Sequence, residues 1–592
     1  MSDEYDILIK NALIVDGTGS KPYNGALSVK GERIEAVGEV SGNLKGDAKT
    51  VINAKGMAVS PGFIDVHNHV DLSILYYPHA QSFVRQGITS FVGGHCGDST
   101  GPYNEYIGEP WFYVDIYHDV RPTMGRSGWL IPIDDFNVRH KELYGWEVNW
   151  DSMAGFFKKV EETGITPNMV PLVGHGDIRS FVMGMDYKRY ATKKEVKEMK
   201  KLVEQAMLDG CRGLSVGRGY EPGSWASFEE ILECAKVSAK YKGVYNSHNL
   251  RRSPRGEYKP NEAPLNPIHG VLEAIDIGRK AKMSVQISHL GSGFSVTPPD
   301  NKIMTEAAIK ATLKTIDDAN EEGLNINFDV IPHHQTGGIF SSPYFVNTFS
   351  KWLKIAGSPE QLVKALEMHD LREEIKEEIK SGKMMMMNPK TDPKWAEKRY
   401  IREHKKSEWV DKNLAEIAEM LDMSAIDVIF EVIMEDPNCK YQSIRNKTDW
   451  VKREYYKHPR MMVGCDTFAV DEFAQCTSPS RMYPNQNAFG GHPGYLRRMV
   501  RETGELTLQE AVRKITSSPA HKFMMTDRGV LKEGAYADIT IWDPKTITDM
   551  GTAVEPRQYP KGIEYVIING EVVVKKNKQN KSMPGKILCR EG

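Results

Sequence analysis

The chain has 592 residues, of which 40% are hydrophobic and 26% are charged, and its formal net charge is −2. This composition is typical of a globular protein, and the length is enough for one large barrel and a smaller domain. The near-neutral charge excludes a strongly basic surface, so we expect no nucleic acid partner, and no apolar run is long enough to predict a membrane span.

The N-terminus and the cysteines bear on the cellular compartment. Residues 1–5 contain two acids and no apolar stretch, so no secretory signal is visible. Seven cysteines are scattered without paired spacing. We therefore expect a cytoplasmic protein whose thiols are free or bound to metal.

The first predicted elements are short strands. They cover Tyr5–Val15, Gly25–Val29 and Arg33–Val37, and Gly and Asn residues separate them. β-rich runs between such turn residues are typical of a small sheet.

The middle of the chain changes to a different rhythm, in which short apolar runs alternate with long helical stretches such as Lys193–Leu208 and Ala307–Glu321. This alternation is typical of the α/β class and predicts a (β/α)8 barrel of the TIM type over residues 61–524. The eight candidate barrel strands are Gly62–Val66, Ile88–Val92, Asn168–Val173, Gly213–Val216, Gly243–Asn246, Ser284–Ile287, Asn325–Val330 and Met461–Gly464.

Two inserts interrupt the predicted barrel. The first, at about residues 101–150, is rich in aromatics, Gly and Pro. The second, at about residues 341–460, is mostly helical and charged, as in Leu371–Lys380. Loops this long usually cover an active site, so we expect a mostly helical insert over the barrel mouth. A contact between subunits of an oligomer is the open alternative.

The C-terminus returns to strands. Asp538–Trp542 and Tyr565–Val574 are both β-rich. Because such runs lie at both ends of the chain, we expect residues 1–60 and 525–592 to build one small β-sandwich domain together.

Histidines, a cysteine and an aspartate follow several predicted barrel strands. His67 and His69 come directly after the first strand at alternate positions, so both imidazoles share one face. The strand ends of a (β/α)8 barrel converge on one mouth. There we expect six side chains to meet: His67, His69, Cys96, His248, His289 and Asp466.

This set of side chains predicts a metal-dependent hydrolase. Imidazole, thiolate and carboxylate are the usual ligands of Zn²⁺, and a catalytic site leaves one position for water. The metal lowers the pKa of that water to about 7, and a carboxylate beside it takes the proton. We expect one or two ions per chain, with Zn²⁺ first and Mn²⁺ or Fe²⁺ as alternatives, and Asp466 as the base. A Ser-His-Asp mechanism is less favoured.

Several segments resemble the amidohydrolase superfamily. Pro61–His69 is similar to its first-strand motif. Other segments resemble the branch of N-acyl-D-amino-acid deacylases, or D-aminoacylases, namely Gly94–Gly97, Leu172–Arg179, Gly213–Ser224, Ser247–His248, Ile287–His289, Gly464–Asp466, Glu510–Ala520 and Gly534–Asp538. The resemblance spans nearly the whole chain apart from the two inserts.

The resemblance implies a division of the metal ligands. Cys96, His248 and His289 would hold the tighter ion, and His67, His69 and Asp466 would form a second, weaker or vacant position. No lysine lies between Asn168 and Arg179, so Cys96 would replace the carbamylated lysine that bridges the metals in other members of the superfamily.

Two departures from the branch bear on the substrate. Branch members usually carry Asp-x-Tyr-Pro-Tyr after the seventh strand and His-Pro-Arg after the last aspartate. This chain has Asp329-Val-Ile-Pro-His333 and His492-Pro-Gly494 instead. In the branch those tyrosine and arginine positions grip the α-carboxylate of the substrate, and glycine cannot replace a bidentate guanidinium.

The loss of this clamp predicts a substrate without an α-carboxylate. We expect ring-opening hydrolysis of a cyclic 1,3-diketone, as in a dihydrophloroglucinol cyclohydrolase-like member, or of a cyclic amide. Deacylation of N-acyl-D-amino acids is the alternative, and a scaffold that has lost its activity is a further one.

The predicted partner is a small-molecule substrate, with no nucleic acid and no membrane, and a homo-oligomer is left open. The residues expected to contact the substrate are polar side chains near strand ends: His175, Arg218, Tyr220, Arg251, His333 and His334. A purely structural role is the alternative for each of them.

Overall fold

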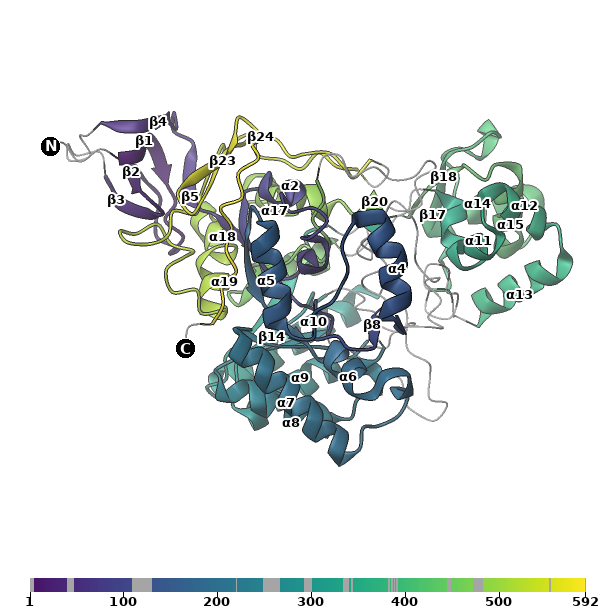
Figure 1. The fold of residues 1–592 in the computed structure, drawn as a ribbon. Helices are drawn as coiled ribbons and strands as arrows, with labels where there is room; N and C mark the ends of the chain where they lie inside the picture. Colours follow the sequence, from purple (N-terminus) through teal and green to yellow (C-terminus); the bar gives the residue numbers. More distant parts are fainter. Residues whose placement is uncertain are drawn as a thin grey trace.

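The computed structural model describes residues 5–39, 47–108, 130–219, 221–248, 267–291, 301–333, 340–341, 344–381, 384, 387, 389, 392–443, 449–471, 483–552 and 555–590. Figure 1 shows three parts: a sheet formed near both ends of the chain, a central α/β region and a helical unit at the opposite side. The central region carries the predicted metal ligands.

Strands from both ends of the chain form one nine-stranded sheet. Its strands are β1 (Tyr5–Ile14), β2 (Tyr23–Lys30), β3 (Arg33–Glu39), β4 (Ala48–Asn53), β5 (Ala58–Pro61), β21 (Ile539–Trp542), β22 (Ile563–Ile568), β23 (Glu571–Lys575) and β24 (Lys578–Gln579). The order is β24-β23-β22-β21-β5-β1-β2-β3, with β4 beside β1. The structure therefore confirms a terminal sheet built from both chain ends.

The strands of the expected β-sandwich all belong to one continuous hydrogen-bonded sheet. Strand β5 pairs with β1 on one side and with β21 on the other, so one ladder joins the N-terminal and C-terminal strands. The run Tyr565–Val574 is divided into the hairpin β22–β23 at Asn569 and Gly570. Both residues have positive φ, 48° and 80°, as a tight Asn-Gly turn requires.

Parallel strands form the centre of the molecule. They are β6 (Phe63–Asp65), β7 (Ile88–Gly93), β10 (Asn168–Pro171), β11 (Val173–Gly174), β12 (Gly213–Gly217), β13 (Val244–His248), β14 (Val285–Ile287), β15 (Ile326–Val330) and β19 (Met461–Val463). They form two hydrogen-bonded sheets, β10-β7-β6 and β11-β12-β13-β14-β15-β19.

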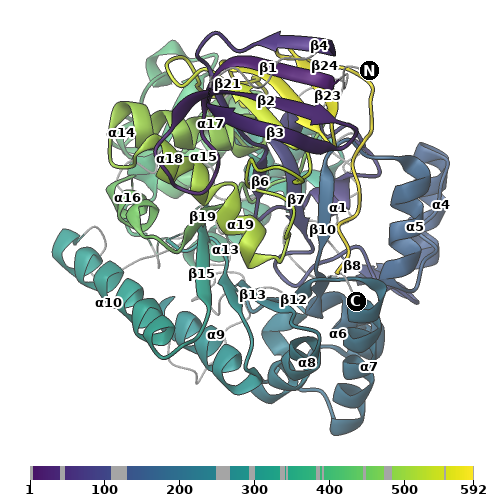
Figure 2. The same ribbon diagram turned by 90° about the vertical axis from the view of Figure 1, so that its left-hand side faces the viewer.

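The eight predicted barrel strands all coincide with strands of these sheets, but the ladder does not close. The third predicted strand is divided at Leu172 into β10 and β11, and the Leu172 N–H bonds to the Gly93 carbonyl. Strands β6 and β19 share no ladder and are joined by hydrogen bonds of the turns that follow them. Figure 2 shows the strands surrounded by helices on their outer side.

The helices around these strands have clear sequence signals. They are α5 (Met153–Thr163), α6 (His175–Met183), α7 (Lys193–Asp209), α8 (Phe228–Lys240), α9 (Pro267–Ala281), α10 (Lys302–Glu321), α16 (Asp449–Lys457), α17 (Asn487–Leu496) and α18 (Leu508–Lys514), with the shorter α1 (Val70–Ser73), α2 (Gln81–Val84) and α19 (Ser517–Lys522). Helix α7 begins at a capping box of Thr192 and Glu195 and ends at Gly210, whose φ is 115°.

The two inserts contain elements of their own. The first has β8 (Tyr106–Gly108), β9 (Leu130–Pro132) and α4 (Ile133–Tyr144). The second has α11 (Ser350–Ala356), α12 (Pro359–Leu366), α13 (His369–Lys380), α14 (Leu414–Leu421), α15 (Ala425–Glu435) and the hairpin β17 (Arg399–Glu403) and β18 (Lys440–Ser443). These helices enclose a separate core that includes Leu362, Ile379 and Phe430.

The helical unit lies to one side of the central region in Figure 1, beyond α4 and the short strand β20 (Tyr483–Pro484). Its role as a cover for the barrel mouth therefore stays a prediction.

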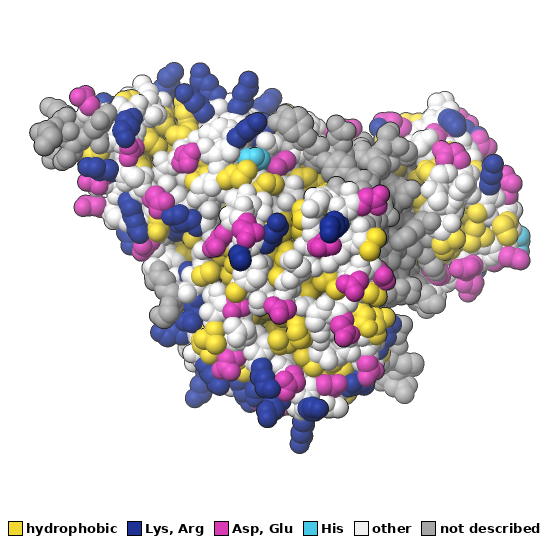
Figure 3. Space-filling model, in the orientation of Figure 1, with side chains coloured by type: hydrophobic (Ala, Val, Ile, Leu, Met, Phe, Trp, Pro, Cys, Tyr) yellow, Lys and Arg dark blue, Asp and Glu magenta, His cyan; other side chains and the backbone are white. Residues whose placement is uncertain are grey.

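None of the helices that the structure describes has the length and apolar character needed to cross a bilayer. In Figure 3, basic and acidic side chains both occur over the central region.

A buried ion pair fastens the terminal sheet to the barrel. The Asp538 carboxylate pairs with Arg528, accepts a hydrogen bond from Asn168 Nδ2 of β10 at 3.2 Å, and accepts one from the Asn569 N–H at 2.8 Å. Both charged side chains are 4% exposed. The sheet and the barrel thus share one buried polar network.

We expect Asp538→Ala to lower the free energy of unfolding by about 3–5 kcal/mol, because Arg528 would lose its counter-charge inside the protein. Chemical or thermal unfolding measures this change. The control is Lys314→Ala, which breaks the exposed pair of Lys314 with Asp318 and should change the free energy by less than about 1 kcal/mol. Equal effects of the two substitutions would contradict the prediction.

Candidate metal centre

The six predicted ligands lie in two overlapping groups where the barrel strands end. His67, His69, Cys96 and Asp466 form one group, and Cys96, His248 and His289 form the other. Within each group the candidate donor atoms lie within 4.8 Å of one another. Cys96 belongs to both groups, so its sulfur lies between them.

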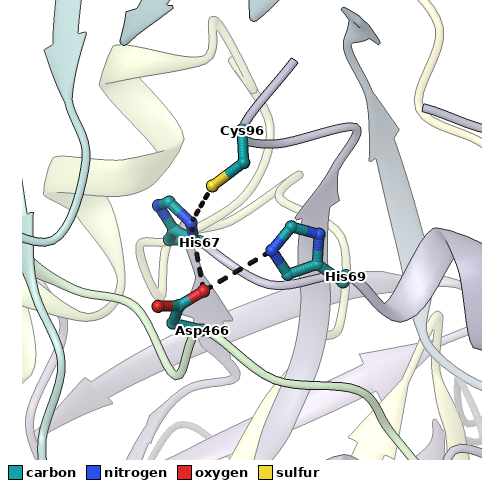
Figure 4. A group of neighbouring side chains, drawn as sticks. All are labelled: His67, His69, Cys96 and Asp466. Carbon is teal, nitrogen blue, oxygen red and sulfur yellow. Dashed lines mark hydrogen bonds and ion pairs between the residues drawn. The ribbon is translucent and has the colours of Figure 1, made fainter. Parts of the chain in front are cut away.

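The distances within the first group are nearly equal. Cys96 Sγ lies 3.4 Å from His67 Nε2, and Asp466 Oδ1 lies 3.5 Å from both His67 Nε2 and His69 Nε2. Figure 4 shows the two imidazoles, the thiol and the carboxylate turned toward a common point.

The second group is slightly tighter. Cys96 Sγ lies 3.3 Å from His248 Nδ1 and 3.8 Å from His289 Nε2. His289 Nε2 lies 2.8 Å from His248 Nδ1, which is a hydrogen-bond distance.

These separations fit a divalent cation. Bonds of about 2.0–2.3 Å in tetrahedral geometry place neighbouring donor atoms about 3.3–3.8 Å apart. The distances between these named atoms fall in this range, except that between His248 Nδ1 and His289 Nε2, which would have to lengthen for both nitrogens to bind one ion. Imidazole, thiolate and carboxylate are also the donor types that zinc prefers.

Burial differs among the side chains of the first group. The His67 side chain is fully buried and that of His69 is 4% exposed, whereas the Asp466 carboxylate is 17% exposed. The carboxylate therefore lies on the accessible side of the group, where water or substrate can reach it.

The electrostatics favour the anionic form of the thiol and the carboxylate. Burial alone would raise the pKa of Cys96, but the imidazoles of His248 and His67 hold it well below its usual value. Burial would likewise raise the pKa of Asp466, but the hydrogen bond from His69 and the charge of His67 lower it. The site thus presents two negative ligands, as cation binding requires.

The backbone is strained at three of the six candidate ligands. Cys96, His289 and Asp466 have φ values of 59°, 36° and 48°, in the left-handed region that side chains with a Cβ rarely adopt. Each such residue costs about 1–3 kcal/mol and persists only where the surroundings fix it, which happens most often at functional sites.

Asp329 is a buried residue of the site that the sequence did not identify. Its Oδ1 lies 3.3 Å from His67 Nδ1 and accepts the His289 N–H at 2.7 Å, and its Oδ2 accepts Gln286 Nε2 at 3.0 Å. A carboxylate on Nδ1 leaves Nε2 of His67 directed toward the centre. In the sequence, Asp329 stood out only as a residue near the end of β15, within the segment that differs from the usual pattern of the branch.

His95 is a second residue that the sequence did not identify as part of the site. Its ring stacks on that of His67, with centroids 4.3 Å apart and an angle of 19° between the planes. Its Nδ1 lies 3.0 Å from Asn246 Oδ1, which accepts but cannot donate, so Nδ1 carries the proton. His95 therefore supports one face of a candidate ligand.

A third cluster lies next to the centre. Asp65, Cys465 and His492 are fully buried, and their candidate donor atoms also lie within 4.8 Å of one another. Burial raises the pKa of the Cys465 thiol well above its usual value and lowers the pKa of His492 to about 3. Because the Cys465 N–H bonds to Asp65 Oδ2 at 2.9 Å and Cys465 Sγ lies 3.5 Å from His492 Nδ1, we interpret this cluster as a hydrogen-bonded support.

The structure describes three of the six predicted substrate contacts, and all three have protein partners. His175 Nε2 lies 3.1 Å from Glu230 Oε1, and His333 Nε2 lies 3.1 Å from Asp549 Oδ2. The Arg218 guanidinium binds Glu273 at 2.8 Å and the Ala226 carbonyl at 2.7 Å. In the described part of the chain none of the three belongs to the metal-binding groups. Tyr220, Arg251 and His334 lie outside the described residues.

Two Gly-x-Ser-x-Gly sequences, at residues 97–101 and 213–217, would suit a serine nucleophile. The Ser99 hydroxyl instead donates to the Gly101 carbonyl at 2.6 Å, and Ser215 Oγ accepts the Gly97 N–H at 3.0 Å. Neither hydroxyl has an imidazole partner among the described residues, which argues against a Ser-His-Asp mechanism.

Comparisons with known proteins agree with this site. The sequence profile of the amidohydrolase family matches residues 390–574. The N-acyl-D-glutamate deacylase of Alcaligenes xylosoxydans xylosoxydans is 27% identical over 595 positions, which cover 100% of this chain and 98% of the relative. The D-aminoacylase of the same organism is 25% identical, with coverage of 100% and 98%.

A solved structure matches over the full length as well. N-acyl-D-glutamate deacylase from Bordetella bronchiseptica, complexed with zinc and a phosphonate inhibitor, covers 100% of both chains with 24% identity and a TM-score of 0.67. This likeness shows the fold. The family profile and the full-length sequence relatives support a metal-dependent hydrolase similar to the amidohydrolases, and to the D-aminoacylases among them.

Proposed function

We propose that the six side chains of the two groups hold one or two divalent cations, with Zn²⁺ first, and that the centre activates water to attack a carbonyl carbon. The observation that carries this proposal is the position of Cys96 Sγ, which lies within 3.8 Å of nitrogen atoms from His67, His248 and His289. A cation held there would lower the pKa of a water molecule and polarise a carbonyl.

Asp466 is the proton carrier of the proposed reaction. Its lowered pKa keeps the carboxylate ionised, so Oδ1 can accept the proton that the attacking water loses. As the new C–O bond forms, the bond to the leaving group breaks and the same proton passes to the leaving atom. The partial exposure of Asp466 permits both contacts, while His67 Nε2 and His69 Nε2, each 3.5 Å from Oδ1, orient the carboxylate.

The comparisons favour an N-acyl-D-amino acid as the substrate over the ring opening expected from the sequence. Both sequence relatives span the whole chain, and their names describe deacylation of such compounds. In this reaction the amide C–N bond breaks, the acyl group leaves as a carboxylic acid and the proton passes to the amine. Deacylation is therefore the first candidate function.

Ring-opening hydrolysis is a second candidate because of the surroundings of Gly494. A Cβ added there would lie 3.0 Å from Asp549 Cγ. The Asp549 carboxylate binds Arg497 Nε at 2.8 Å and lies beside His333. A carboxylate thus lies at the position where the branch usually has an arginine, which favours a substrate without an α-carboxylate, such as a cyclic 1,3-diketone or a cyclic amide.

A panel of three substrate classes tests both candidates. Zinc- or manganese-loaded protein is offered N-acetyl-D-amino acids, hydantoins and 1,3-cyclohexanedione derivatives, and release of amine or loss of enolate absorbance is followed. Turnover of the first class alone supports deacylation, and turnover of the cyclic compounds alone supports ring opening. A metal-loaded protein that hydrolyses none of them would contradict both.

In an Asp549→Asn background, which removes the carboxylate next to position 494, we expect Gly494→Arg to raise kcat/KM for N-acetyl-D-amino acids about tenfold, because a charge-assisted hydrogen bond contributes about 1.5–3 kcal/mol. Steady-state kinetics measures the change. Gly494→Lys is the matched control: it adds the same charge without the planar fork and should give a smaller gain. No gain with arginine would contradict the idea that the chain lacks a carboxylate clamp at this position.

A further inference from the structure

We infer that Asp65 is a positioning residue that sets the spacing between two ligand-bearing turns. One turn follows β6 and carries His67 and His69, and the other follows β19 and carries Asp466. The inference rests on the proposed function, because it assumes that these turns bind a metal ion together.

The two turns meet at the seam where the barrel ladder is not closed. The Asp466 N–H bonds to the His67 carbonyl at 2.7 Å, and the His69 N–H bonds to the Thr467 carbonyl at 2.9 Å. These bonds pair donors of both turns with backbone acceptors of the opposite turn. The N–H groups of His67 and Cys465 take a side-chain acceptor instead.

Asp65 supplies that acceptor. Its Oδ1 accepts the His67 N–H at 3.1 Å and Asn68 Nδ2 at 2.8 Å, and its Oδ2 accepts the Cys465 N–H at 2.9 Å. One oxygen therefore holds each turn. Because the two oxygens belong to one rigid carboxylate, the side chain fixes how far apart the turns lie.

The position of Asp65 makes these bonds difficult to replace. The residue is fully buried, so water cannot reach the two N–H groups when the carboxylate is lost. His492 closes the far side, with Nδ1 at 3.7 Å from Asp65 Oδ2, and its ring stacks on Phe63. The carboxylate thus lies in a closed compartment directly behind the candidate ligands.

Gly464 allows the two turns to approach each other closely, because it has no side chain. A Cβ added at this residue would lie 2.4 Å from the Cβ of His67, so a side chain here would force the two turns apart. The close approach allowed by Gly464 and the two hydrogen bonds to Asp65 act on the same distance. Asp466 is the residue after Cys465, and its strained φ of 48° lies in the turn that these contacts hold in place.

Asp65→Asn tests the inference with almost no change of shape. An amide has one acceptor oxygen and one donor nitrogen, so one of the two N–H groups would face another donor. The turn that loses its acceptor should shift and move His67 away from Asp466. We expect the affinity for Zn²⁺ to fall about 10–100-fold, as it does when a residue that orients a ligand is removed.

The measurement is competition for Zn²⁺ between the full-length protein and a chromophoric chelator. Asp538→Asn is the matched control, because Asp538 is also a buried carboxylate that accepts a backbone N–H, at the junction with the terminal sheet. Its affinity should stay within about twofold of the wild type, less than the loss expected for a residue that orients a ligand. An unchanged affinity of Asp65→Asn, or an equal loss in both variants, would overturn the inference.

A double-mutant cycle tests whether Asp65 acts through Asp466. In a chain that already carries Asp466→Ala, the further change Asp65→Asn should weaken binding less than it does alone, because the turn after β19 then no longer carries its candidate ligand Asp466. An equal loss in both backgrounds would show that Asp65 does not set the spacing between the turns.

Gly464→Ala keeps the test valid where Asp65→Asn does not fold. It separates the same turns by steric contact and should reduce Zn²⁺ affinity while circular dichroism shows a native fold; unchanged affinity would count against the inference. A wild-type chain that binds no Zn²⁺ would remove the proposed function itself. A wild type that binds Zn²⁺, with equal binding by Asp65→Asn, would remove only the role of Asp65.

Discussion

Replacing Cys96 with alanine should reduce kcat at least about 1,000-fold and lower the affinity of both ligand groups for metal. The Cys96 sulfur is shared by the two groups, so its removal takes one donor from each of them. A bound cation contributes several kcal/mol to the stabilisation of a developing negative charge, and about 4 kcal/mol corresponds to a factor of about 1,000 in rate. Metal analysis and steady-state kinetics on the purified variant measure the two effects.

Cys234→Ala is the matched control for this experiment. Cys234 is a fully buried thiol on α8 whose pKa burial raises above its usual value, and among the described residues it belongs to none of the candidate metal-binding groups. This variant should bind metal and turn over substrate as the wild type does. A Cys96→Ala chain that retained its metal and more than about a tenth of its activity would contradict a central role for the sulfur, since loss of a Lewis acid costs far more.

The candidate ligands could be predicted from the sequence because their positions follow a general rule. Residues directly after the strands of a (β/α)8 barrel face one mouth, so a His, Cys or Asp at several such places indicates a shared site. The structure places His248 at the end of β13 and Cys96 three residues after β7, and their donor atoms lie 3.3 Å apart. Their roles as ligands stay a proposal until metal is measured.

Asp65 and Asp329 could not be predicted in this way. Each acts by accepting backbone N–H groups of residues that are distant in the chain: Cys465 lies 400 positions from Asp65, and His289 lies 40 positions from Asp329. A buried aspartate at a strand end has no local pattern that reveals such a partner. Only the packing of one strand end against another brings donor and acceptor together.

The predicted substrate contacts show the opposite difficulty. Arg218 is a charged residue near a strand end, as a substrate contact would be, yet its guanidinium is held by Glu273 and by carbonyls of the following loop. A sequence cannot distinguish an arginine that waits for a ligand from one that already has a buried counter-charge. The same applies to His175 beside Glu230.

The positions of the strands could be predicted from the sequence, but the pairing between strands that are distant in the chain could not. The barrel strands and the terminal strands were located from their composition, but the sequence did not reveal that β5 joins both chain ends in one ladder. It also gave no sign that Leu172 divides the third strand. Both features depend on long-range hydrogen bonds, which local propensity does not encode.

Asp466→Asn should lower kcat by about 10²–10⁴ while the group of Cys96, His248 and His289 keeps its metal. An amide has nearly the same shape as the carboxylate but cannot accept a proton from water at neutral pH. Because the neighbouring imidazoles lower the pKa of Asp466, the wild-type carboxylate stays ionised down to acidic pH. The loss of kcat should therefore be uniform across the neutral range, and a pH profile of kcat with parallel metal analysis checks this.

Asp471→Asn separates the chemical role of Asp466 from an effect on the loop. Asp471 lies on the same segment, and its carboxylate accepts the Gln81 N–H at 3.0 Å, so Asp471→Asn removes a charge from this loop without touching the candidate ligands. Its kcat should stay within a few-fold of the wild type, well short of the loss expected when a catalytic base is removed. If Asp466→Asn lost all of its metal, the carboxylate would be required as a ligand, and if it kept more than about a tenth of kcat, a different group would have to carry the proton. Only a variant that holds its metal and fails to turn over assigns the proton transfer to Asp466.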